Sequence, residues 1–210
     1  MSSKAWKRQP EKRPAQIMEA AIRVFSEKGF RAATMDEVAD AAGITKGTIY
    51  LYFESKTELF VEAVRAQLQE VLDLLPSIQY EPGADPEKLT KELGVKFLDV
   101  LMSEKVAQVI PLIIAEFKNI PVLKQIYFSE ILSKSDFQVA NLIEMGKALG
   151  LVRDVEPMIA TRLLLGSFFL FALTQEVLGA KEVTPMNPGD IAATIATVCF
   201  RGLMKTEALP

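Results

Sequence analysis

Two helix-start signals on either side of a glycine constrain the fold of this chain more than any other feature of its sequence. Thr34 can accept the N-cap hydrogen bond of a helix, and Glu37 stands three residues later, where it completes a capping box. Gly43 suits the left-handed residue that ends a helix, and Thr45 can cap the next one. The stretch therefore predicts two short helices joined by a tight turn.

The side chains of this stretch separate into an inner and an outer face. Ala39, Gly43 and Ile49 stand at the spacings that let two helices cross closely around a turn, as in a helix-turn-helix motif. We therefore place such a motif at residues 34–53. The outer face is then left to Lys46, Thr48, Tyr50 and Tyr52.

The residues around the turn also carry a family resemblance. The run KGTIYLYFESKTELF after AAGIT, with a helix ending in EKGF upstream, resembles the TetR family of bacterial repressors. The resemblance covers roughly residues 14–64 and does not extend as readable motifs into the remainder. It implies a DNA-binding domain at 14–64 and a ligand-binding and dimerisation domain at 65–210, which share a connecting helix at 56–75.

Helical periodicity continues through the rest of the chain. Apolar stripes at helical spacing recur up to the last segment, a Pro- and Gly-rich loop interrupts them at 77–86, and no strand pattern competes. We predict an all-α fold of about nine helices, in which a three-helix DNA-binding unit is joined to a larger helical domain.

By position in the family motif, eight residues are expected to contact DNA. Threonine hydroxyls, tyrosine OH groups and lysines can bind phosphate or sugar, whereas Gly47 lets the backbone approach bases and Thr48 can read a base edge. Lys56 lies in the first turn of a helix, where an anion is favoured. The full set is Thr34, Thr45, Lys46, Gly47, Thr48, Tyr50, Tyr52 and Lys56.

The charge distribution agrees with DNA binding at the N-terminal end. The net charge is −3, yet residues 1–56 hold ten Lys and Arg against seven Asp and Glu. Residues 1–13 form a basic arm that either follows phosphates or enters a minor groove, or else remains a solvated, flexible tail. Both interpretations stay open. The basic residues of the arm are Lys4, Lys7, Arg8, Lys12 and Arg13.

The second domain is expected to bind a small hydrophobic effector, because it is rich in the aromatic and Met side chains that suit adaptable apolar pockets. Arg162 interrupts an apolar helix and, if buried, needs a carboxylate, for which Glu116 or Glu144 is plausible. The candidate pocket residues are Phe97, Leu101, Phe117, Phe128, Met145, Arg162, Phe168 and Phe171.

No cofactor, metal or catalytic residue is predicted. The chain has no His, so it cannot reproduce the imidazole-ligated tetracycline–Mg²⁺ site of the founding family members, although a carboxylate-only Mg²⁺ site stays open. No Cys/His cluster suits zinc, and no nucleophile–base or carboxylate pair indicates catalysis. An enzyme is therefore the least favoured function class.

The helices at 157–178 and 188–205 are the expected homodimer interface, since the first is apolar nearly all round and the second carries small residues. A two-fold dimer predicts a palindromic operator. We expect a cytoplasmic, ligand-responsive repressor that does not enter membranes, because the longest apolar run, 163–173, is too short to span one. The alternative is a lipid- or isoprenoid-binding protein of the same fold that does not bind DNA.

Overall fold

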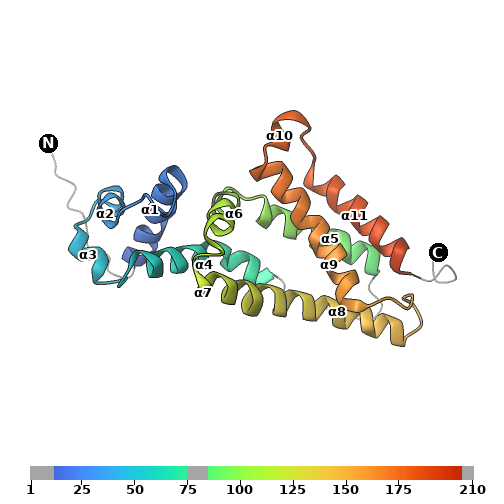
Figure 1. Ribbon diagram of the computed structural model, residues 1–210. Helices are drawn as coiled ribbons and strands as arrows, with labels where there is room; N and C mark the ends of the chain where they lie inside the picture. Colours follow the sequence, from blue (N-terminus) through green and yellow to red (C-terminus); the bar gives the residue numbers. More distant parts are fainter. Residues whose placement is uncertain (1–11, 75–84, 205–210) are drawn as a thin grey trace.

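The computed structural model describes residues 12–74 and 85–204, which form eleven α-helices, two π-helical segments and no strand (Figure 1). The all-α prediction is confirmed. Segments α7, η3 and α8 follow one another without a break, as do α9 and η4. Nine continuous helical runs of the described residues therefore correspond to the predicted helices, and only the four-residue α10, Ala180–Val183, was not expected.

The N-terminal end is a compact three-helix unit built from α1 (Arg13–Lys28), α2 (Met35–Ala42) and α3 (Lys46–Tyr50). It lies at one end of the elongated molecule in Figure 1. Its core contains Phe25 and Phe60, whose ring centroids lie 5.6 Å apart in an edge-to-face arrangement. Phe60 belongs to the following helix, α4, so this helix completes the core of the unit, and the buried residues of the unit and of the rest of the molecule form one continuous apolar cluster.

The helix starts predicted around the turn are present. The Thr34 hydroxyl accepts a hydrogen bond from the Glu37 amide at 3.3 Å, and the Glu37 carboxylate accepts one from the Thr34 amide at 2.9 Å. Gly43 has a φ of 65°, in the left-handed region, and Thr45 caps α3. With Ile49 fully buried between the helices, the motif has the geometry that the sequence predicted.

Two helices join this unit to the larger body. Helix α4 (Lys56–Leu74) begins beside α1 and continues into the body, where it packs on α5 and α6. Helix α6 (Glu104–Glu116) contacts α1 and α4. The predicted basic arm, apart from Lys12 and Arg13, lies outside the described residues, as does most of the predicted loop at 77–86.

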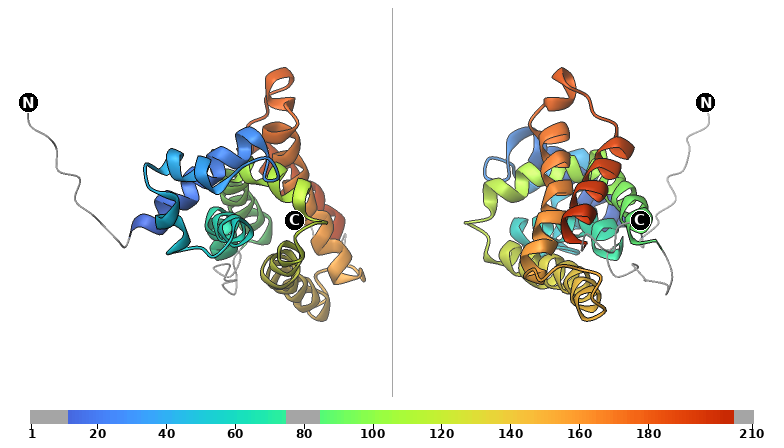
Figure 2. Two further views of the ribbon diagram at one scale, coloured as in Figure 1. Left: turned by 60° about the vertical axis from the view of Figure 1, so that its left-hand side comes forward. Right: turned by 90° about the vertical axis from the view of Figure 1, so that its right-hand side faces the viewer.

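Four long helices form most of the body, and Figure 2 shows α9 and α11 side by side on one flank. Helix α5 packs against α11 and α9, and α9 also crosses α8. The bounds of the body elements are α5 Pro86–Leu101, α7 Pro121–Gln125, η3 Ile126–Leu132, α8 Ser133–Ala148, α9 Pro157–Ala172, η4 Leu173–Val177 and α11 Pro188–Leu203.

The continuous helix Pro157–Val177 is much less enclosed than its composition predicts. The helix has 21 residues, and its most apolar 18-residue window has a mean hydropathy of 1.6, enough in length and composition for a membrane span, but only 22% of that window is buried. It packs on α5, α8 and α11 with one face and leaves Leu163 and Leu170 more than half exposed. An exposed apolar face of this size indicates an interaction surface.

Candidate functional sites

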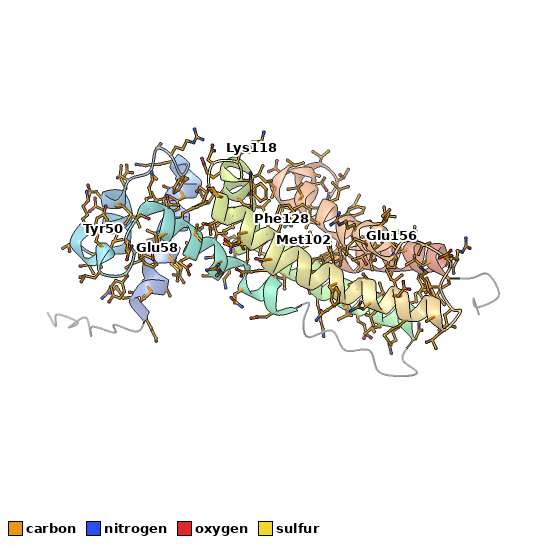
Figure 3. All side chains as sticks on the ribbon, turned by 60° about the horizontal axis from the view of Figure 1, so that its bottom comes forward. Tyr50, Glu58, Met102, Lys118, Phe128 and Glu156 are labelled. Carbon is orange, nitrogen blue, oxygen red and sulfur yellow. The ribbon has the colours of Figure 1, made fainter. Side chains whose placement is uncertain are left out.

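The outer face of the helix-turn-helix carries two exposed tyrosines. Tyr50 is 47% exposed and Tyr52 is 38% exposed, whereas Ile49, which directly precedes Tyr50, is fully buried. Figure 3 shows Tyr50 at the end of the molecule formed by α2 and α3, remote from the helical body. Both hydroxyls can therefore reach an external partner without any change in the packing of α3.

Gly47 leaves an open spot on the same face. A Cβ built at this position would meet only the Thr45 hydroxyl oxygen, at 4.0 Å, and the backbone φ of Gly47 is not positive. Neither packing nor backbone conformation therefore requires glycine here. A requirement for glycine would have to come from a molecule that approaches the backbone closely.

The predicted threonines already take part in local hydrogen bonds. The Thr34 hydroxyl donates to the Glu37 carboxylate at 3.0 Å, and the Thr45 and Thr48 hydroxyl oxygens lie 2.9 Å apart. All three side chains lie in exposed surroundings, so they hold the helix ends in place while remaining accessible to a phosphate. Their DNA contacts stay a prediction.

Lys46 projects from the first turn of α3 and pairs with Asp36 of α2 at 2.9 Å. The hydrogen bond that the Lys46 ammonium donates to the Asp36 carboxylate raises the pKa of this ammonium above its usual value. Because Lys46 and Asp36 are both more than half exposed, a phosphate can compete for the ammonium at little cost. Asp36 is a residue that the sequence interpretation did not single out.

Lys56 has a structural position that the sequence did not reveal. Its ammonium donates to the carbonyl oxygens of Phe30 at 2.8 Å, Arg31 at 3.1 Å and Ala33 at 2.7 Å, and it lies 4.8 Å from the centre of the Phe30 ring. An ammonium has three protons, so these carbonyls use all of them. A phosphate contact by Lys56 would have to displace at least one carbonyl.

A small apolar cavity of about 100 Å³ lies in the body among α5, α8 and α9. Phe97 and Phe168, which were both predicted to line a pocket, meet there edge to face with centroids 6.1 Å apart. The i, i+4 stripe of Leu89 and Leu93 on α5 was a signal that could have identified this wall. The other lining residues are Leu89, Thr90, Leu93, Gly94, Val139, Leu142, Leu164 and Leu165.

The structure does not bring the remaining pocket candidates to this cavity. Leu101 belongs to the buried core and Phe171 packs against it. Phe117 and Phe128 instead each stack edge to face on Tyr127, at 5.6 and 5.3 Å. Met145 is 56% exposed.

The ion pairs proposed for Arg162 are wrong. Arg162 is mostly exposed and pairs with Asp136 at 3.2 Å, while Glu116 pairs with Arg31 at 3.2 Å. Glu144 instead pairs with Lys147. Helix periodicity does not reveal the Arg162–Asp136 pair, because the two residues come from α9 and α8, whose crossing only the fold determines.

A shallow apolar groove of about 590 Å³ runs between α9 and α11. Ile159, Leu163 and Val198 line it and are each more than 60% exposed. Cys199 also lines it, and burial raises the pKa of its thiol. Across the described part of the chain, no cluster of three or more Cys, Asp or Glu side chains could hold a metal ion.

The three-helix unit exposes the outer face of α3, the second helix of the motif, and is attached to a larger helical body. This arrangement is that of a helix-turn-helix DNA-binding protein. Two family models match the chain: bacterial regulatory proteins of the tetR family over residues 17–63, and the C-terminal domain of AefR-like transcriptional repressors over residues 88–201. The chain belongs to the TetR family of bacterial transcriptional regulators.

Similar proteins agree with this membership. The transcriptional regulator YfiR of Bacillus subtilis is 43% identical over 72 residues, which cover 34% of this chain and 35% of YfiR. TtgR of Pseudomonas putida is 34% identical over 97 residues, 46% of each chain. The chain thus aligns with less than half the length of these two relatives.

Solved structures share the fold over nearly the whole chain. NalD of Pseudomonas aeruginosa, the secondary repressor of the MexAB-OprM multidrug efflux pump, superposes with a TM-score of 0.71 at 22% identity, covering 94% of this chain and all of NalD. The fatty acid degradation regulator FadR of Bacillus halodurans gives 0.65 at 20% identity, covering 93% of this chain and 97% of FadR.

Proposed function

We propose that this protein is a dimeric repressor that binds a palindromic operator through α3 and leaves it when a small hydrophobic effector binds the helical body. The observation that carries the proposal is the outer face of α3. There Tyr50 is exposed and Gly47 is open to an approaching molecule, while Ile49 holds the helix in the core. Such a face suits the major groove, where backbone and hydroxyl groups approach bases and phosphates.

A second copy of the chain is proposed to pack on the groove between α9 and α11. The exposed apolar side chains of this flank would be removed from water by a two-fold partner, and a small residue in the groove, Gly202 of α11, lets helices approach closely. The two α3 helices would then enter successive major grooves roughly 34–36 Å apart. This spacing accounts for a palindromic operator.

The effector is proposed to bind the cavity among α5, α8 and α9. Its walls are almost entirely Leu, Val and Phe, which favours an apolar molecule. Helix α6 offers a connection from the body to the DNA-binding unit, because the buried carboxylate of Glu116 accepts from Arg31 of that unit. An effector that binds better to a form with the wrong α3 spacing would shift the population away from DNA.

The proposal places the protein in the cytoplasm, where its DNA partner is. A gel shift with the DNA upstream of its own gene tests it, with wild-type protein beside Tyr50→Ala and Ile114→Ala. Tyr50 and Ile114 are both exposed apolar side chains, but Ile114 lies on α6, away from α3. We expect only Tyr50→Ala to lose retardation while keeping its melting temperature. Wild-type protein that binds apolar molecules but never retards this DNA would support a carrier of the same fold instead.

A further inference from the structure

The helix-turn-helix is acidic, although it is the part of the molecule that meets DNA. Residues 34–53 hold three acidic side chains and one lysine, a formal balance of −2. The acidic residues are Asp36, Glu37 and Asp40 on α2, and the lysine is Lys46 on α3. Because DNA carries a dense array of negative charge, the carboxylates of such a surface oppose binding unless the protein neutralises them.

Two of these carboxylates are neutralised by ion pairs of different kinds. Glu37 pairs with Lys28 of α1 at 2.6 Å and also accepts a hydrogen bond from the Thr34 amide at 2.9 Å, so its pair belongs to the scaffold of the unit. Asp36 pairs at 2.9 Å with Lys46, the one cation of the motif. Asp36 therefore engages the side chain that a phosphate would need.

The Asp36–Lys46 pair lies on the outer face of the motif. The Asp36 side chain is 60% exposed and the Lys46 side chain 52% exposed. Tyr50 follows Lys46 by one turn on the same side of α3. Asp36 contributes most to the raised pKa of Lys46 and Tyr50 adds to it, so the ammonium is within electrostatic reach of both residues.

A role in helix stability accounts for only one half of this pair. Asp36 lies in the first turn of α2, where the helix dipole favours a carboxylate. Glu37 supplies a second carboxylate to the same turn. The dipole does not require a lysine, and it gives no reason for Asp36 to engage a cation ten residues later on the other helix of the motif.

We propose that Asp36 is a specificity-determining residue, whose carboxylate keeps Lys46 from the phosphates of unrelated DNA and releases it when α3 is seated in the operator. The inference rests on the proposed operator binding through α3. The carboxylate belongs to the same unit and is always within reach, whereas a phosphate of loosely bound DNA is not. In the operator, base contacts fix the register of the duplex and hold one phosphate beside Lys46.

The strength of the pair suits such an exchange. An ion pair between two side chains that are more than half exposed contributes little to stability, because water screens both partners. A phosphate that is held in place can therefore replace the carboxylate of Asp36. On unrelated DNA no base contacts favour the exchange, so Lys46 stays paired and contributes no phosphate contact. Removal of the carboxylate should therefore strengthen binding to unrelated DNA most.

Asp36→Asn in the full-length protein tests this by fluorescence anisotropy with two duplexes, the DNA upstream of its own gene and a scrambled DNA of equal length and composition. We expect the affinity for scrambled DNA to rise by about threefold to tenfold, since two pairs in the dimer no longer compete, and the affinity for upstream DNA to rise by less than half as much. The salt slope on scrambled DNA should steepen by about two, one phosphate for each subunit. An equal rise on both duplexes, or no rise on scrambled DNA, overturns the proposal.

Asp40→Asn is the matched control, because it removes the same charge from α2 one turn further along the same face. Asp40 is exposed, and it pairs with no cation in the part of the chain that the structure describes. We expect a smaller rise and an unchanged salt slope. In the Lys46→Met background, Asp36→Asn should have no more effect than Asp40→Asn. A full rise without Lys46, or an equal rise in Asp40→Asn, would mean that Asp36 acts only through net charge, and would overturn the proposal.

The ion pair can also be tested without DNA. Lysine side-chain NMR of the free protein should show that the pKa of Lys46 is lower in Asp36→Asn than in wild type, and that Asp40→Asn leaves it unchanged. An unchanged pKa in Asp36→Asn would contradict the pair. A lower melting temperature of Asp36→Asn with unaltered DNA selectivity would leave Asp36 only its role in the dipole of α2, and would also overturn the proposal.

The two duplexes separate this inference from the proposed repressor. If wild type does not prefer upstream DNA but Asp36→Asn gains affinity for scrambled DNA only when Lys46 is present, the proposed repressor of this operator is refuted and the competition for Lys46 stands. A preference for upstream DNA that Asp36→Asn does not reduce would support the repressor and refute the inference. Wild type and variants that bind neither duplex would refute both.

Discussion

A substitution at Gly47 should affect DNA binding without lowering the stability of the fold. Because a Cβ there meets no atom within 4 Å except the Thr45 hydroxyl, Gly47→Ala should leave the free energy of unfolding unchanged or raise it by up to about 1 kcal/mol through helix propensity. The added methyl group should obstruct the base edges and weaken operator binding by about tenfold, or about 1.4 kcal/mol. Chemical denaturation and fluorescence anisotropy measure the two effects.

Gly43→Ala is the matched control for that variant. Gly43 has a φ of 65°, where a Cβ is strained, so alanine should destabilise the protein by about 1–2 kcal/mol. If Gly47→Ala were the more destabilising of the two, the open surface at Gly47 would be misassigned.

The two lysines that were predicted to contact DNA, Lys46 and Lys56, should respond differently to truncation. Lys56→Met removes the donor from three backbone carbonyls, two of them in partly buried surroundings, and should lower the free energy of unfolding by about 1–3 kcal/mol. Lys46→Met breaks only an exposed ion pair with Asp36, so it should weaken DNA binding with little change in stability. Urea denaturation of both variants tests this. Equal stability losses would contradict the structural position of Lys56.

Glu37 makes the stability of α2 sensitive to acid. Hydrogen bonds from Lys28 first, and then from Thr34, lower the pKa of the Glu37 carboxyl to about 2 from its ordinary value of 4.5. Since the folded-state pKa is the lower one, the stabilisation by Glu37 is complete above about pH 4.5 and is lost as the pH falls towards 2. The melting-temperature advantage of wild type over Glu37→Gln should shrink across that window. A constant advantage from pH 6 to pH 2.5 would argue against the bonded carboxylate.

At the level of helices, the sequence was informative wherever a signal is local. The caps at Thr34, Thr45, Ser103, Asp85 and Asn187 each accept a backbone amide hydrogen bond from within three residues, so a short stretch of sequence determines them. The cavity is different. Its walls depend on how α5, α8 and α9 cross, and helical periodicity identifies the buried face of each helix but not its crossing point.

The same distinction accounts for the mixed outcome of the individual site predictions. Tyr50 was placed outside and Ile49 inside from the local pattern, and the structure agrees. Lys56 also looked like an outward residue, because nothing in its neighbourhood in the sequence reveals that carbonyls 23 to 26 residues earlier surround its ammonium. The DNA contacts and the domain boundaries at residues 64 and 65 stay predictions.

Helices α9 and α11 carry the prediction for assembly. Leu163 is 65% exposed on the apolar groove, so Leu163→Glu would place an unpaired carboxylate in the proposed interface from both copies. We expect the dissociation constant of the dimer to rise at least about tenfold, or about 1.4 kcal/mol, in sedimentation equilibrium. Ile114→Glu, at a 60% exposed position on α6, should remain dimeric. A monomeric wild type, or equal behaviour of both variants, would exclude this interface.

For the whole molecule, the account depends on two copies of a helix-turn-helix that bind one DNA duplex together. A net charge of −3 argues against indiscriminate binding, so affinity has to come from phosphate contacts concentrated at the α2–α3 end. Each phosphate contact releases counterions, and the salt dependence of affinity counts such contacts. The slope of affinity against salt concentration can be measured without knowing the effector or the operator sequence.

The salt dependence of binding to the DNA upstream of its own gene, measured by fluorescence anisotropy with excess unrelated DNA as competitor, is therefore the most direct test. With about four phosphate contacts from each of two subunits, the logarithm of affinity should fall against the logarithm of salt concentration with a slope of roughly −7. A slope of half that size would indicate a single subunit on the DNA. A flat dependence would contradict DNA binding by this protein.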